Sequence, residues 1–202
     1  GKSTLMKILY GIYIPDEGGE LILDDKPFKP GRPIDAIRRG LTMVPQEISP
    51  AANLTIADNF YLGREITKGK FFLNQKAMNE QASAILKELG VPMDVTEKMS
   101  DVSVAKAQLV AIATAVSNDA KVIIMDEPTT ALTENEVDQL YRIIETVKAR
   151  GIAIIFISHK LDEVFRVSDE ITVIRDGQYV DTKPTKEVTK EQLISMMVGR
   201  DM

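Results

Sequence analysis

Four consecutive residues at the start of the sequence could bind phosphate. Gly1-Lys2-Ser3-Thr4 matches the end of the pattern G-x-x-x-x-G-K-[ST], and a helical segment follows, as that pattern requires. In such a site the backbone N–H groups hold phosphates, Lys2 neutralises β/γ oxygens and Ser3 binds Mg²⁺. A lysine and a cap at an exposed helix start would have the same short sequence, so these residues alone leave both interpretations open.

Two adjacent carboxylates at the end of an apolar run could serve the same chemistry. Residues 122–125 are predicted to form a buried strand, and Asp126 and Glu127 follow it directly. Successive side chains of a strand point to opposite faces, so one carboxylate could lie near Mg²⁺ and the other beside an attacking water. An ordinary acidic strand end before Pro128 is the alternative.

Three further polar residues stand at the ends of predicted elements. Gln46 lies just beyond the predicted strand Leu41–Val44, and Ser103 begins a helix. His159, the only histidine of the chain, follows the predicted strand 152–157. A site at the carboxyl edge of a parallel sheet would gather such residues. Each has a plain structural explanation alone, but their joint appearance in this order favours a site.

The elements that must position these residues alternate between apolar strands and helices. This pattern predicts an α/β fold with a parallel sheet. From residue 55 to residue 117 the apolar residues instead follow a helical period, which predicts a helical insertion. The predicted helices before it are 5–13 and 34–39, and the predicted strands of the sheet half are 20–23, 41–44, 122–125 and 152–157.

The second half of the chain adds an amphipathic helix and a hairpin. Thr133 and Glu136 form a capping box for the helix, and Gly151 stands where a left-handed cap belongs. Residues 171–180 predict a hairpin with a primed turn at Asp176-Gly177.

The composition restricts the class of protein. The chain has 202 residues, 44% of them hydrophobic and 27% charged, which suffices for one domain with an inserted subdomain. The net charge of -5 argues against a dedicated nucleic-acid binder, so no nucleic acid is expected as a partner. With no cysteine there is no disulfide and no thiolate metal site. The opening residue is Gly rather than Met, which predicts a removed upstream segment.

The ordered motifs resemble those of the ATP-binding cassette (ABC) ATPases over essentially the whole chain. Residues 1–4 resemble the end of the Walker A loop and residues 122–127 the Walker B strand. The resemblance implies a P-loop NTPase (RecA-like) core in residues 1–47 and 119–202 with a helical subdomain at 48–118. The remaining motifs are the Q-loop glutamine Gln46, the signature stretch 102–106, the D-loop 130–133 and the switch histidine His159.

Within this family the chain resembles the first cassette of the tandem ATPases that drive bacterial import of monosaccharides such as ribose, galactose or xylose. The resemblance implies membrane permease subunits and a second ABC cassette as partners, a periplasmic sugar-binding protein as an indirect partner, and a peripheral place on the cytoplasmic face of the inner membrane. The stretches that carry it are 61–64, 125–133, 157–160, 175–178 and 196–200.

ATP and Mg²⁺ are the cofactors that the resemblance implies. The nucleotide would be bound by Gly1, Lys2, Ser3 and Thr4 of one cassette, and Ser103 of a second cassette would cap the γ-phosphate in trans. The first amides of the helix that Ser103 begins would add donors and a favourable dipole.

The resemblance also assigns the catalytic and metal-binding residues. Glu127 would act as general base or water orienter, and His159 would hydrogen-bond the γ-phosphate. Gln46 would contact Mg²⁺ and the water and would sense the membrane subunits through the helical subdomain. The Mg²⁺ ligands would be Ser3, Gln46 and Asp126.

Three features depart from the family's pattern. The signature Leu-Ser-Gly-Gly-Gln is replaced by Val102-Ser103-Val104-Ala105-Lys106, which we interpret as a subfamily trait. Thr133 stands where many members carry an aspartate. The glycine-rich part of the phosphate loop would precede Gly1, so this piece alone is expected to bind ATP poorly.

Two alternatives to an ATP-hydrolysing importer subunit stay open, the first of them because of these departures. One is a regulatory cassette that binds nucleotide with weak or no hydrolysis, and the other is a soluble ABC ATPase that acts on ribosomes or DNA. An unrelated P-loop kinase is disfavoured because it leaves Gln46, Ser103 and His159 unexplained.

Overall fold

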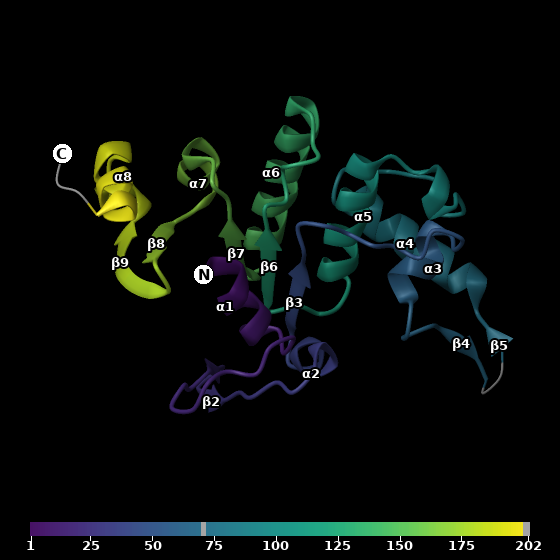
Figure 1. The fold of residues 1–202 in the computed structure, drawn as a ribbon. Helices are drawn as coiled ribbons and strands as arrows, with labels where there is room; N and C mark the ends of the chain where they lie inside the picture. Colours follow the sequence, from purple (N-terminus) through teal and green to yellow (C-terminus); the bar gives the residue numbers. More distant parts are fainter. Residues whose placement is uncertain (70–71, 200–202) are drawn as a thin grey trace.

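The centre of the structure is a three-stranded parallel sheet. A computed structural model describes residues 1–69 and 72–199. Its strands β3 (Leu41–Val44), β6 (Val122–Asp126) and β7 (Ala153–Ile157) pair in the order β3-β6-β7 (Figure 1). The register places Val44 opposite Met125 and Asp126 opposite Ile157, so the carboxyl ends of the three strands meet at one edge. The predicted α/β class with a parallel sheet is confirmed.

Helices cover both faces of this sheet, which explains why β6 is apolar without alternation. Ile124 packs into a cluster with Met6 of α1 (Lys2–Leu9) and Ala36 of α2 (Pro33–Arg38). Ile123 and Met125 belong to a second cluster on the opposite face, formed with α5 (Val104–Val116) and α6 (Glu134–Ala149). All three β6 side chains are fully buried. Strands buried on both faces have continuous apolar sequences, as expected from residues 122–125.

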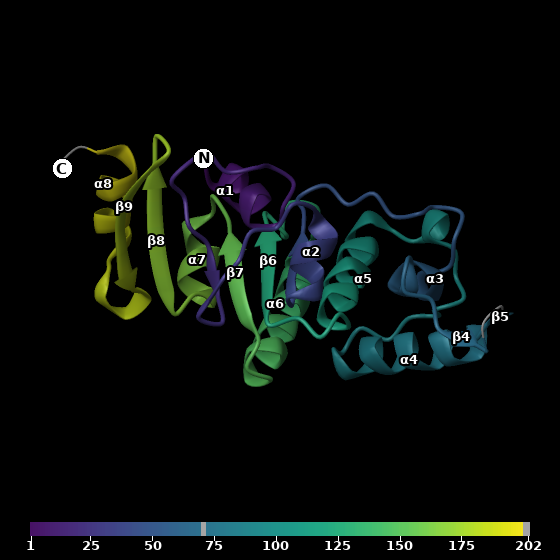
Figure 2. The same cartoon turned by 90° about the horizontal axis from the view of Figure 1, so that it is seen from below.

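The chain between β3 and β6 is largely helical and lies to one side of the sheet (Figure 2). It forms α3 (Ile56–Tyr61), α4 (Gln75–Glu88), a 3₁₀ turn at Met99–Asp101 and then α5. A small antiparallel hairpin of β4 (Thr67–Lys68) and β5 (Phe72–Leu73) interrupts the helices and was not expected. Strands of two residues are too short to show an alternating pattern. The division into a core and a helical subdomain at 48–118 stays a prediction.

Several boundaries differ from the sequence prediction. The first helix spans Lys2–Leu9, not 5–13, because Gly11 has a left-handed φ of 78° and ends it before Pro15. A Cβ at Gly11 would lie 2.9 Å from the Arg32 carbonyl, so the chain turns where only glycine fits. The predicted strand 20–23 shrinks to β1 (Ile22–Leu23), paired with β2 (Lys26–Pro27). The helix predicted at 34–39 lies one residue earlier, and the strand predicted at 152–157 begins one residue later and ends as predicted.

The second half follows the prediction closely. The Glu136 carboxylate accepts hydrogen bonds from both the backbone N–H and the hydroxyl of Thr133, and these bonds lower the pKa of Glu136. Asp176 and Gly177 both have positive φ, as a type I′ turn requires. The remaining elements are α7 (Leu161–Val167), β8 (Glu170–Arg175), β9 (Gln178–Pro184), a 3₁₀ turn at Thr185–Glu187 and α8 (Lys190–Val198).

One arginine ties the end of α3 to the end of α5. The Arg64 guanidinium donates to the Phe60 carbonyl at 2.7 Å and to the Ser117 carbonyl at 3.2 Å, and it lies 5.1 Å from the centroid of the Tyr61 ring. Lysine has its donors on a single nitrogen and lacks the planar fork with which the guanidinium contacts both carbonyls and the ring. We expect Arg64→Lys to lower the free energy of unfolding by about 1 kcal/mol in urea titrations. Arg142→Lys, at an exposed position of α6, should leave the free energy of unfolding unchanged. An equal loss of stability in both variants would contradict a stabilising role for the Arg64 contacts.

Within residues 1–69 and 72–199, no helix combines the length and the apolar character needed to cross a bilayer.

Candidate active site

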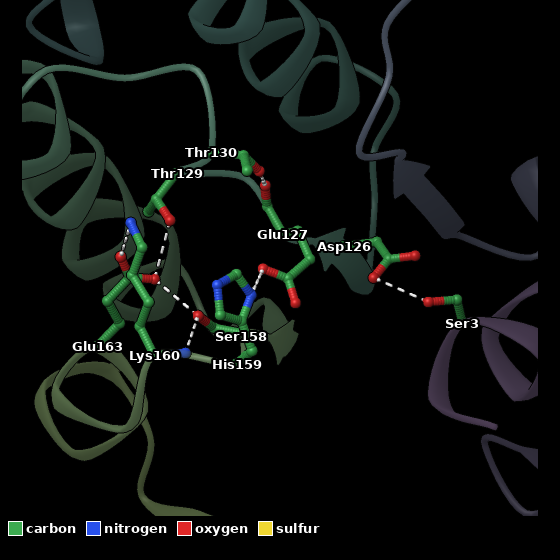
Figure 3. Close-up of polar contacts among 9 residues, drawn as sticks. All are labelled: Ser3, Asp126, Glu127, Thr129, Thr130, Ser158, His159, Lys160 and Glu163. Carbon is green, nitrogen blue, oxygen red and sulfur yellow. Dashed lines mark hydrogen bonds and ion pairs between the residues drawn. The ribbon is translucent and has the colours of Figure 1, made fainter.

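Two pairs of side chains meet at the carboxyl edge of the sheet. The first joins α1 to β6: the Ser3 hydroxyl donates a hydrogen bond of 3.3 Å to Oδ1 of Asp126 (Figure 3). Asp126 is the last residue of β6 and is 4% exposed. A buried carboxylate is costly unless it is paired or binds a cation, so the position of Asp126 suits a metal ligand.

The second pair joins the loop after β6 to the loop after β7. Nδ1 of His159 lies 2.7 Å from Oε2 of Glu127 (Figure 3). An ionised carboxylate only accepts hydrogen bonds, so the proton belongs to the His159 nitrogen. The Glu127 side chain is 16% exposed and the His159 side chain 65%, which leaves the pair open to solvent on the histidine side.

The backbone at Glu127 is held in an uncommon conformation. Its φ is 49°, in the left-handed region that residues other than Gly, Asn and Asp seldom adopt. Two hydrogen bonds fix it: the Glu127 N–H donates to the Ile157 carbonyl at 2.9 Å, and the Thr130 hydroxyl donates to the Glu127 carbonyl. Such strain costs about 1–3 kcal/mol and is typical of functional sites.

The start of α1 is suited to an anion. Gly1 precedes the helix without a side-chain cap, and the first turn holds no acidic residue. Lys2 instead places a positive charge at the positive end of the helix dipole, which is unfavourable without an anion. Free amides and a lysine at a helix start together form a phosphate site. Thr4, the last residue of the predicted motif, is exposed on the same turn.

Gln46 and Ser103 lie outside these two pairs. Gln46 is exposed two residues beyond the end of β3, at the same sheet edge as Asp126. Ser103 is exposed as the N-cap of α5, where its hydroxyl accepts from the Lys106 N–H at 3.3 Å. Within residues 1–69 and 72–199, neither side chain has a hydrogen bond to Ser3, Asp126, Glu127 or His159. The helix start predicted at Ser103 is confirmed, and its action in trans stays a prediction.

A polar network behind the Glu127–His159 pair was not foreseen from the sequence. Glu163 of α7 accepts hydrogen bonds from the hydroxyls of Thr129 and Ser158, and Lys160 pairs with it (Figure 3). Thr129 and Ser158 belong to stretches that the sequence singled out, but Glu163 does not. An acidic residue in the first turn of a helix usually balances the helix dipole, so the sequence offers no sign that this one is buried.

The residues at this edge could provide part of the coordination shell of Mg²⁺. Ser3 and Asp126 offer a hydroxyl and a carboxylate oxygen, and Mg²⁺ prefers one or two protein oxygens completed by water and phosphate. In the described ranges no group of three His, Cys, Asp or Glu side chains could hold a metal without such help.

A pocket of about 280 Å³ lies beside β3, between the loop after Gln46 and α5. Its lining includes Tyr10, Met43, Ile48, Pro50, Asn59 and Ala111. Burial raises the pKa of the Tyr10 phenol. Thr42, 2% exposed, also lines this pocket, and its hydroxyl has no hydrogen-bond partner in the described part of the chain.

Curated proteins of similar sequence are named as import ATP-binding proteins. The chain is 46% identical over 203 residues to a putative ribose/galactose/methyl galactoside import ATP-binding protein of Geobacillus kaustophilus. It is 45% identical over 202 residues to a galactose/methyl galactoside import ATP-binding protein of Photobacterium profundum. All of this chain is covered in both comparisons, but it spans 40% of the length of each relative.

Solved structures of similar fold are ATP-binding cassettes. One, described as an ATP-binding cassette of an ABC transporter, matches with a TM-score of 0.82 and 24% identity over 98% of this chain and 82% of that one. A nucleotide-free cassette matches with a TM-score of 0.77 and 25% identity over 97% and 79%. The fold is that of the P-loop NTPases. Residues 1–130 match the ABC transporter family, and the chain belongs to that family.

Proposed function

We propose that this chain is an ATP-hydrolysing cassette that drives import of a monosaccharide through a membrane permease. The observation that carries the proposal is the placement of Ser3–Asp126 and Glu127–His159 side by side at one sheet edge, next to an uncapped helix start. The names of the relatives support an importer over the regulatory cassette and the soluble ATPase considered above.

ATP would bind with its phosphates at the start of α1. The amides of Lys2, Ser3 and Thr4 and the Lys2 ammonium provide donors and positive charge for the β- and γ-phosphates. Ser3 and Asp126 would hold Mg²⁺, with Gln46 as a further oxygen donor from the end of β3. The ion would supply neutralisation of charge on the phosphate oxygens.

Hydrolysis would then depend on Glu127 and His159. Glu127 accepts a proton from the attacking water while the oxygen of that water bonds to the γ-phosphorus. The bond between the γ-phosphorus and the bridging oxygen of the β-phosphate breaks, which gives ADP and phosphate. His159 already presents its Nδ1 proton to Glu127. Nε2, the other nitrogen of the ring, remains to hydrogen-bond a γ-phosphate oxygen.

A second cassette would complete the site. Ser103, Val104 and Lys106 at the start of α5 are exposed, and this helix start suits a γ-phosphate held by a partner cassette. Val104 of the same turn is 65% exposed. We infer that the replaced signature glycines do not abolish this contact.

The permease would dock over the pocket beside β3. That pocket adjoins Gln46 and is bounded by α5 of the proposed helical subdomain (48–118). A segment of the permease inserted into it would therefore contact the core and this subdomain together. A cassette docked in this way would lie peripherally on the cytoplasmic face of the inner membrane, and a periplasmic sugar-binding protein would act through the permease.

The test is ATP turnover by the full-length protein, with and without its permease in lipid vesicles. We expect the permease to stimulate turnover, and Ser49→Trp, at an exposed position of the pocket lining, to reduce the ratio of stimulated to unstimulated turnover. Ser83→Trp on the exposed face of α4 is the matched control and should keep the wild-type ratio. An ATP turnover that is the same with and without the permease would contradict the importer assignment.

A further inference from the structure

A buried carboxylate lies behind the Glu127–His159 pair and takes no part in the chemistry proposed above. Glu163 is 7% exposed. Its Oε2 accepts hydrogen bonds from the Thr129 hydroxyl at 2.9 Å and from the Ser158 hydroxyl at 2.8 Å (Figure 3). Its Oε1 lies 3.1 Å from Nζ of Lys160. One carboxylate therefore joins the loop after β6 to the loop after β7.

Each of the two loops carries one member of the catalytic pair. Thr129 follows Glu127 by two residues, and Ser158 directly precedes His159. The Ser158 hydroxyl also accepts from the Lys160 N–H at 3.0 Å, so the backbone on both sides of His159 is tied to the same network. A shift of Thr129 or Ser158 would therefore change the distance between Glu127 and His159.

Burial makes this connection rigid. Thr129 is 2% exposed and Ser158 is 7% exposed, so water has little access to replace their hydrogen bonds to Glu163. His159 is different: its side chain is 65% exposed, and few neighbours restrict the ring. The ring must be held through its backbone and through Glu127, and the network fixes both.

We propose that Glu163 is a positioning residue that, by bonding Thr129 and Ser158 at once, holds Glu127 and His159 at hydrogen-bond distance for ATP hydrolysis. This inference rests on the proposed function for its catalytic consequence. The geometric part, that Glu163 sets the Glu127–His159 contact, can be measured without turnover.

The test compares Thr129→Val with Thr129→Ser in the full-length protein. Valine keeps the shape and removes the hydroxyl, while serine restores it. Misplacing a reacting group by about 1 Å can cost about a hundredfold in rate, so we expect Thr129→Val to lower kcat by about ten- to a hundredfold at unchanged KM for ATP. Thr129→Ser should restore most of kcat. A folded Glu163→Ala variant should show the same loss of kcat as Thr129→Val.

A second measurement reports the geometry itself. In histidine-labelled protein, the ring-nitrogen NMR shifts of His159, assigned with His159→Gln, show whether Nδ1 is hydrogen-bonded. Thr129→Val should lose the bonded signature and Thr129→Ser should keep it. Asp162→Asn, which neutralises an exposed carboxylate of the same helix turn, should match wild type in both measurements.

The outcomes separate this inference from the proposed function. A wild-type protein without ATP turnover would contradict the proposed function alone, because the ring shifts would still decide whether the network holds the pair. Unchanged ring shifts in Thr129→Val would overturn the inference, whatever happens to kcat or to stability. Equal effects of Thr129→Val and Thr129→Ser would overturn it as well, because the hydroxyl would then not be the cause.

Discussion

Replacing Glu127 by glutamine is expected to lower ATP turnover by about 10²- to 10⁴-fold while ATP still binds, because glutamine cannot accept the proton of the attacking water. The substitution changes little else. Glutamine has the same shape, its carbonyl can accept the Nδ1 hydrogen bond of His159, and the left-handed backbone of residue 127 is held by main-chain contacts that do not involve the carboxylate.

Three measurements make this prediction specific. Single-turnover kinetics with labelled ATP should show slow cleavage, equilibrium binding should show an unchanged dissociation constant, and the thermal midpoint should match wild type. Glu145→Gln removes an exposed carboxylate of α6 and serves as the control for loss of one charge. Normal turnover by Glu127→Gln would remove the general base from the mechanism and, with it, the main support for an ATP-hydrolysing cassette.

The sheet and its site edge could be predicted because the signals were local. The apolar run of β6 and the two carboxylates after it are contiguous in sequence, and parallel pairing then brings the ends of β3, β6 and β7 together. The cap at Thr133, the left-handed Gly151 and the turn at Asp176-Gly177 are likewise set by the chemistry of single residues, and the structure confirms all three.

What could not be predicted depends on contacts between distant residues. Glu163 is separated from Thr129 by 34 residues, and nothing in the short helix α7 shows that its carboxylate turns inward. The end of α1 was wrong for a related reason. Pro15 was the visible stop signal, but the close approach of Arg32 to Gly11 forces the earlier turn, and that approach exists only in the folded chain.

The left-handed conformation of Glu127 was also invisible in the sequence. A strand that simply continued would send residue 127 to the face opposite Asp126, as the alternation argument assumed. Instead β6 ends at Asp126, and the turn aims Glu127 towards His159. The backbone turn, rather than strand alternation, separates the two carboxylates, and their different roles stay a prediction.

Replacing Asp126 by asparagine is expected to change stability and activity in opposite directions. Asp126 is 4% exposed, and the side-chain hydrogen bond that the described part of the chain gives it comes from Ser3. Burying a charge with so little compensation is unfavourable without a cation. Asparagine keeps an acceptor for Ser3 and removes the charge, so the free energy of unfolding without Mg²⁺ should rise by about 1 kcal/mol.

The same substitution should weaken Mg²⁺ binding in the presence of ATP, by at least about ten- to a hundredfold, because one charged oxygen ligand is lost. Thermal melts with and without MgATP would show both effects: a higher midpoint for Asp126→Asn alone, and a smaller upward shift on adding MgATP. Asp138→Asn, at an exposed residue paired with Arg166, is the matched control for charge. If Asp126→Asn kept the wild-type dependence of turnover on Mg²⁺, the buried carboxylate would need another explanation than a metal ligand. A loss of stability would point instead to a structural role for the contact with Ser3.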